Sequence, residues 1–300
     1  ARIDRELAPL LKLYGRTPAV EFGPLRLKTV LDSLVKATWV RTSINHAAGT
    51  IKRCFRWATE NELIPGSVFQ ALQAVAGLRA GRSEAKESEP VKPVPAVHVN
   101  AILPHVSAQV AAMIQLQMLT GARPGEIVIM RGCDIDTTGK LWIYKPTRHK
   151  TAFHGHAREI YLGPRSQDVL RPFLKLDTQS YLFAPREAEA DRQNRRHAAR
   201  KTPLSCGNVP GSNRRRRPMT TPGDGYDVAA YRRAIARACI KADVPDWHPH
   251  QLRHTAATEL RKSHGLEAAQ VLLGHRTLSV TQIYAEKNVE AAMKIAASIG

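Results

Sequence analysis

The chain has 300 residues, of which 43% are hydrophobic, enough for one large or two ordinary domains with buried cores. Its 45 Lys and Arg outnumber its 26 Asp and Glu, so the formal net charge at pH 7 is +19. A surplus of this size favours a polyanionic partner, because each phosphate that a cation neutralises releases a condensed counterion. No apolar run approaches the length of a membrane span, and the first ten residues carry charges where a signal peptide is apolar. We therefore expect no membrane segment.

The four cysteines lie far apart and form no CxxC pair. This predicts free thiols in a reducing cytoplasm, without disulfides or a zinc site.

Residues 1–79 predict a small basic helical domain. Apolar residues recur with helical spacing at 27, 30, 31, 34 and 35, and again at 44, 48, 51, 55 and 58. Arginines and lysines occupy other faces of the second of these segments. Residues 80–96, rich in proline and charge, then predict a linker.

A second domain is expected at 97–300. Two helical segments open it, three short strands are predicted at 141–145, 158–162 and 180–184, and helices return from Asp227 to the end. The predicted fold class is α+β and mainly helical: a helical first domain and a mixed second domain with one small antiparallel sheet.

A basic insert spans about 185–225. Residues 186–217 contain ten Lys and Arg against three Asp and Glu, including the run 214–217, and they contain few apolar residues. This composition predicts a long solvated loop. Two roles stay open: an insertion without function, or a contact to a nucleic-acid backbone that becomes ordered on binding.

Three segments of the second domain carry residues suited to phosphate chemistry. In HPHQLRHTAATEL, His250 and Arg253 are three residues apart, which places them one helical turn apart. In LLGHRTLSVTQIY, Gly274 fits a helix C-terminus, and Tyr284 follows His275 by nine residues. In TGARPGE, Arg123 directly precedes a helix start, where it could bind an anion or pair with a nearby acid such as Glu126.

In this order the three segments resemble the boxes of the tyrosine recombinase (phage integrase) family. The segment RHKTAFHGHAREIYL is similar to the family's β-hairpin lysine segment and places Lys150 in that role. The helical segment around residues 44–58 resembles, more loosely, the core DNA-binding domain of the family. The likeness covers nearly all of the chain except the basic insert, which lengthens the chain beyond compact family members.

The resemblance implies a site-specific recombinase that cleaves and rejoins double-stranded DNA through a 3′-phosphotyrosine. It assigns the nucleophile to Tyr284, phosphate stabilisation to Arg123 and Arg253, and the base to His250. It gives a hydrogen bond to the phosphate to His275 and protonation of the leaving 5′ oxygen to Lys150. It further implies no metal or nucleotide cofactor, a homotetramer assembled on DNA, and a cytoplasmic, nucleoid-associated protein.

Other functions remain open at this point. A type IB topoisomerase shares the same catalytic residue types, and a relative that binds DNA without cleaving it would share the fold. An RNA-binding basic protein would explain the charge but not the ordered boxes. The resemblance also leaves open the biological task, which could be phage integration, movement of a mobile element or chromosome resolution.

Overall fold

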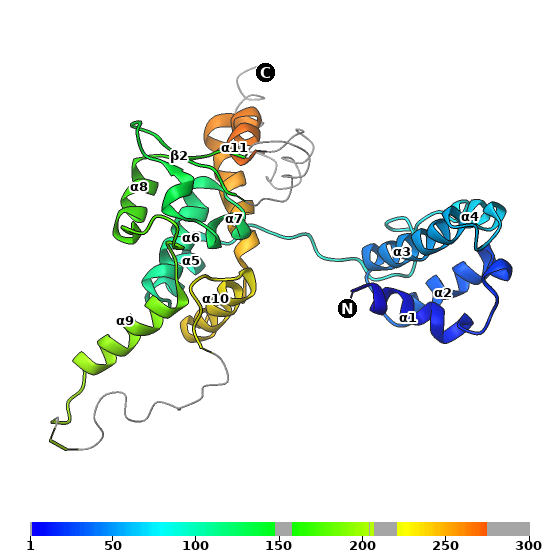
Figure 1. Ribbon diagram of the computed structural model, residues 1–300, viewed down its shortest axis with the longest axis horizontal. Helices are drawn as coiled ribbons and strands as arrows, with labels where there is room; N and C mark the ends of the chain where they lie inside the picture. The colour runs from blue at the N-terminus through cyan, green and yellow to red at the C-terminus, as the bar shows by residue number, and fades with distance from the viewer. Residues whose placement is uncertain (1, 148–157, 204, 207–220, 275–300) are drawn as a thin grey trace, which may run out of the picture. The chain divides into compact units, whose positions relative to one another are not determined.

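The computed structural model describes residues 2–147, 158–203, 205–206 and 221–274. The chain divides into two compact units, Ala1–Pro90 and Val91–Gly300 (Figure 1). Each unit has a hydrophobic core of its own.

The first unit is built from helices. They are α1 (Arg2–Tyr14), the 3₁₀ turn η1 (Ala19–Glu21), α2 (Pro24–Lys36), α3 (Arg41–Glu60) and α4 (Gly66–Gln73). The two predicted apolar faces are confirmed, because α2 buries Leu27, Val30, Leu31 and Leu34, while α3 buries Ile44, Ala48, Ile51 and Phe55. Polar burial also occurs: the Glu6 carboxylate of α1 accepts a hydrogen bond from Thr50 of α3 at 2.5 Å.

The proline-rich segment between the units is anchored at both ends. Ala85 is buried in the core of the first unit and Val94 in the core of the second. The backbone N–H of Val94 donates to the hydroxyl of Thr255 at 2.9 Å.

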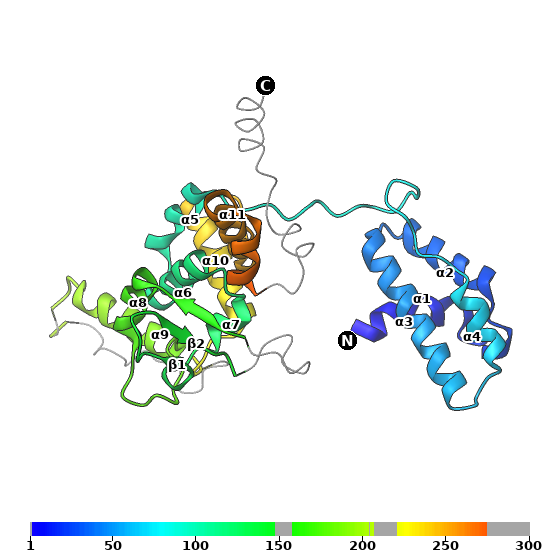
Figure 2. The ribbon, with the colours of Figure 1, turned by 90° about the horizontal axis from the view of Figure 1, so that it is seen from above.

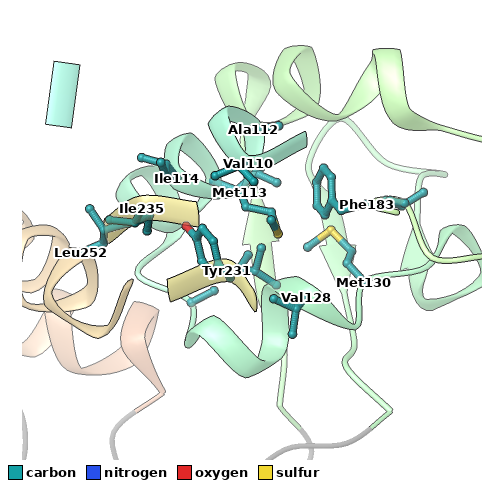
Figure 3. Close-up of a cluster of buried hydrophobic side chains, with 14 of the residues drawn as sticks. Val110, Ala112, Met113, Ile114, Val128, Met130, Phe183, Tyr231, Ile235 and Leu252 are labelled. Carbon is teal, nitrogen blue, oxygen red and sulfur yellow. The ribbon is translucent and has the colours of Figure 1, made fainter. Parts of the chain in front are cut away.

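The central helix of the second unit is α6 (Ala108–Thr120). It lies between a small sheet and the helices α10 and α11 (Figure 2). Side chains of α6, α10 and α11 meet in the core, where Met113, Tyr231 and Leu252 are fully buried (Figure 3). The helical elements of this unit are α5 (Ala96–Ile102), η2 (Leu103–His105), α6, α7 (Pro124–Val128), η3 (Gly132–Asp134), α8 (Pro164–Leu170), η5 (Arg171–Phe173), α9 (Pro185–Ala198), α10 (Val228–Ala242) and α11 (Pro249–Leu273).

The sheet has three antiparallel strands in the order β1 (Ile135–Asp136), β2 (Trp142–Tyr144) and β3 (Ile160–Leu162). Tyr144 pairs with Ile160 and, on its other side, with Ile135. Two of the predicted strands are confirmed. The third, at 180–184, is wrong: that segment forms a single bridge between Tyr181 and Arg131, and Pro185 begins a helix directly after it. Its apolar residues pack into the core of the second unit. A buried strand would show the same run of apolar residues in the sequence.

The prediction of a solvated loop is wrong for the first part of the insert, where residues 185–198 form α9. Pro185 fits the first helical position, and Glu187 near the start and arginines near the end suit the helix dipole. Glu189 pairs with Arg192 one turn later at 2.8 Å, and Asp191 accepts from Gln109 of α6. These polar contacts hold a helix in which only Ala188 is buried, so hydrophobic periodicity could not reveal it.

None of the helices in the described parts of the chain combines the length and apolar character that a membrane span requires.

Candidate active site

Arg123 stands at the start of α7, as the sequence predicts. The helix α6 ends at Gly121, whose φ of 63° lies in the left-handed region that favours glycine. The chain then turns into α7 with Arg123 as its N-cap and Pro124 in the first turn. The Glu126 carboxylate accepts from both the backbone N–H and Nη1 of Arg123, each at 2.8 Å. The guanidinium is thereby fixed, and it remains partly exposed.

A second arginine flanks the same carboxylate. Arg158 lies two residues before β3. Its side chain is 7% exposed, and its Nε is 3.6 Å from Oε1 of Glu126. Burial alone raises the pKa of Glu126, but the charge of Arg158, the backbone N–H of Arg123 and the Arg123 guanidinium together lower it below its ordinary value. Glu126 is therefore an ionised carboxylate between two guanidiniums. It is buried, and its hydrogen bonds hold the Arg123 side chain in place.

His250 lies in the first turn of α11 and faces a cavity. Burial, followed by the nearby charges of His254, Arg253, His248 and Arg123, lowers the pKa of His250 to about 4. The imidazole is consequently neutral at pH 7, the form that can accept a proton.

Arg253, three residues further along α11, is fully buried. Its Nη1 donates to the carbonyl of Gly121 at 2.6 Å and its Nη2 to the carbonyl of Leu273 at 2.7 Å. Arg253 thus joins three places: α11, the turn before Arg123, and the end of α11 beyond the bend at Gly265. The sequence predicts that His250 and Arg253 share one side of the helix, whereas the structure places only His250 at the surface of the cavity.

The cavity has a volume of about 650 Å³, and the guanidiniums of Arg123 and Arg232 give its lining a net positive charge. Arg123 and His250 meet there with Arg232 of α10 and His248, while Glu126, the carboxylate among its described lining residues, is already paired. Burial and the charge of Arg232 lower the pKa of His248. A cationic hollow with an adjacent neutral base suits a phosphodiester.

Sequence reasoning missed Arg232, His248 and Arg158. Arg232 follows a clear helix start, since Asp227 caps α10, but helical spacing alone does not show which side faces a cavity. Arg158 was predicted only as part of a strand segment, because burial of an arginine leaves no periodic signal.

Three of the predicted catalytic residues lie outside the described residues. Lys150 belongs to the segment that connects β2 to β3, and Tyr284 to the segment after α11. His275 directly follows Gly274, which ends α11 with a φ of 63° as predicted for a helix C-terminus.

Comparison with known proteins identifies the family of this chain. The model of the phage integrase family matches residues 96–291, which is most of the chain and includes every predicted catalytic residue. The chain belongs to the phage integrase family. It is a site-specific tyrosine recombinase, an enzyme that breaks and rejoins DNA. The resemblance inferred from the ordered motifs is confirmed.

Relatives of this recombinase are found among the Xer enzymes. The tyrosine recombinase XerD of Ralstonia nicotianae is 28% identical over 81% of this chain and 68% of its own length. The tyrosine recombinase XerC of Lacticaseibacillus casei is 26% identical over 93% of this chain and 84% of its own length.

Solved structures share the fold. A lambda integrase dimer bound to a COC′ core site aligns with a TM-score of 0.60 and 16% identity, over 95% of this chain and 87% of that one. The Tn1549 transposon integrase in complex with circular intermediate DNA aligns with a TM-score of 0.60 and 16% identity, over 97% of this chain and 91% of that one. The predicted fold class is therefore confirmed.

Proposed function

We propose that this recombinase cleaves DNA by attack of the Tyr284 oxygen on a backbone phosphorus. A bond forms between the tyrosine oxygen and phosphorus, and the bond from phosphorus to the 5′ oxygen breaks. The product is a 3′-phosphotyrosine and a free 5′ hydroxyl. Attack by a 5′ hydroxyl from another strand reverses the step, so the phosphodiester energy is kept and strands are exchanged.

His250 is the proposed base for the Tyr284 proton. The free phenol has a pKa of about 10 and needs a base at neutral pH. The observation that carries this role is the neutral imidazole beside the Arg123 guanidinium in the cationic cavity. We assign protonation of the leaving 5′ oxygen to Lys150 and a hydrogen bond to the phosphate to His275, on the basis of their positions in the family motifs.

The two box arginines would stabilise the charge that builds on the nonbridging oxygens. Arg123 is already at the cavity and fixed by Glu126. Arg253 is buried and donates to two backbone carbonyls, so a phosphate can reach its guanidinium only after groups around it move. We infer that such a movement accompanies DNA binding.

The active assembly is inferred to be a homotetramer on double-stranded DNA, acting in the cytoplasm on nucleoid DNA. Exchange between two duplexes requires four strand cleavages, and each chain offers one Tyr284. We assign residues 1–79 to binding of the core site, because the cationic cavity lies in the other unit and the first unit resembles the family's core-binding domain.

The nucleophile assignment is tested by Tyr284→Phe. The variant removes the attacking oxygen, so we expect it to bind DNA as the wild type does and to form no covalent adduct. A nicked suicide substrate followed by a denaturing gel separates adduct from free protein. A shifted band that persists in Tyr284→Phe would refute the assignment.

A further inference from the structure

Arg158 is a buried arginine within the segment that resembles the family's β-hairpin lysine segment, and the roles proposed above do not include it. The residue is 8% exposed, and from its place two residues before β3 it reaches two separate parts of the site. On one side its Nε faces the Glu126 carboxylate at 3.6 Å. On the other side its Nη1 donates to the carbonyl of Leu272 at 3.5 Å, in the last turn of α11.

The contact at the end of α11 is close. Gly274 leaves the helix in the left-handed region, and a Cβ added there would overlap Nη1 of Arg158. The absence of a side chain at 274 therefore makes room for the arginine. The next residue is His275, so the position of Arg158 bears directly on where the chain departs toward His275 and Tyr284.

These contacts are poorly suited to stability alone. Burial lowers the pKa of Arg158, and the proximity of Arg123 adds to that effect while Glu126 opposes it. Its Nε and Nη2 make no hydrogen bond to any of the described residues, so the contact with Glu126 is an ion pair without a hydrogen bond. A desolvated cation with an incomplete set of partners is weak evidence for a stabilising ion pair.

We propose that Arg158 is a positioning residue for strand cleavage. It holds Glu126 against Arg123 and at the same time fixes the end of α11, so that the phosphate-binding arginine and the segment bearing the nucleophile keep one geometry. This inference rests on the proposed roles of Arg123 and Tyr284.

The guanidinium shape is needed for this task, because one edge faces a carboxylate and another nitrogen reaches a carbonyl on a different element. An ammonium has the same charge but lacks the rigid fork. Arg158→Lys should consequently keep the charge and make only one of the two interactions, whereas Arg158→Met makes neither, with a side chain of similar reach.

The experiment measures single-turnover adduct formation on a suicide substrate at saturating protein, with DNA affinity measured separately. We expect Arg158→Met to bind DNA nearly as the wild type does and to cleave on the order of 10²-fold more slowly, the loss that misplacement by about an ångström causes. Arg158→Lys should cleave about tenfold more slowly than the wild type. Glu126→Gln combined with Arg158→Met should be no slower than the worse single variant, because both changes release the same guanidinium.

Arg171→Met is the matched control, since Arg171 is exposed and pairs with Asp168 on α8, and it should cleave at the wild-type rate. A wild-type cleavage rate for Arg158→Met would overturn the proposal. If the methionine variant does not fold, Arg158→Lys decides, and a wild-type rate for it would overturn the proposal equally. Failure of the proposed function looks different: the wild type would form no adduct, or Tyr284→Phe would still form one.

Discussion

His250 is neutral at pH 7, and the groups around it favour that form. The lowered pKa follows from burial and from the positive neighbours, which both penalise the imidazolium. Before DNA binds, this environment keeps the imidazole in the form that can accept a proton. An incoming phosphate adds negative charge nearby and so favours protonation as the reaction proceeds, which is the direction that a base for Tyr284 needs.

The same shift predicts a pH dependence of stability. The pKa of His250 is about 4 in the folded chain and near its ordinary value of 6.5 when unfolded. Between these values only the unfolded state takes up the proton, so the free energy of unfolding falls as the pH drops from about 6.5 toward 4, and it is unaffected by this group above 6.5. We expect His250→Gln to lose less stability than the wild type between pH 7 and pH 5.

Urea unfolding midpoints of both proteins at the two pH values provide the measurement. His197→Gln, a change at an exposed histidine of α9, serves as the control. Parallel losses in the wild type and in His250→Gln would show that the imidazole is not held neutral by the fold.

At the scale of elements, α9 places several cations along one cavity. Arg192, Arg195 and Arg196 line a hollow of about 360 Å³ together with Lys241 of α10 and His105, and none of the described residues that line it is a carboxylate. The site cavity contacts α10 at Arg232, nine residues before Lys241. At 1.5 Å and about 100° per residue, Arg232 and Lys241 lie about 14 Å apart along the axis of α10 and on opposite sides of it.

We expect this surface to contact the DNA backbone. Arg195→Gln combined with Arg196→Gln should weaken binding to all sequences alike and reduce the slope of log affinity against log salt, by roughly 0.9 for each phosphate that is no longer neutralised. The measurement uses a duplex that extends well beyond the core site. The same pair of changes at Arg165 and Arg171, two arginines on another part of the unit, controls for net charge. If the salt dependence of affinity is the same as in that control, α9 does not contact the DNA backbone.

Sequence patterns predicted the elements that bury an apolar face, and they failed where burial or helicity has another cause. The faces of α2 and α3 were evident because Leu27 and Ile44 recur with their neighbours at helical spacing. The helix α9 was missed because ion pairs and polar contacts hold it. The strand predicted at 180–184 was wrong because a buried extended segment gives the same apolar run as a strand.

In the candidate site too, the sequence predicted local features and missed long-range contacts. Local motifs placed Arg123 at a helix start and Gly274 at a helix end, because capping is a property of neighbouring residues. The burial of Arg253 against Gly121 and the link from Arg158 to Glu126 join residues far apart in the chain. Such contacts depend on tertiary packing, which one sequence does not display.

At the scale of the whole molecule, the two units each enclose a separate core. The core of the first contains Leu34, and that of the second contains Leu116, both at most 1% exposed. Units with separate cores can lose stability independently, because removing packing from one leaves the packing of the other unchanged.

Leu34→Ala tests this independence. Removing a buried leucine side chain should destabilise the first unit by about 2–5 kcal/mol, since transfer energy is lost and a cavity remains. Hydrogen exchange should then accelerate at the amides of α3 and stay unchanged at those of α6. Leu116→Ala is the matched counterpart and should give the reverse pattern. Faster exchange in α6 of Leu34→Ala would mean that the two units unfold as one, and the covalent-adduct assay on the same variant would show whether cleavage depends on that coupling.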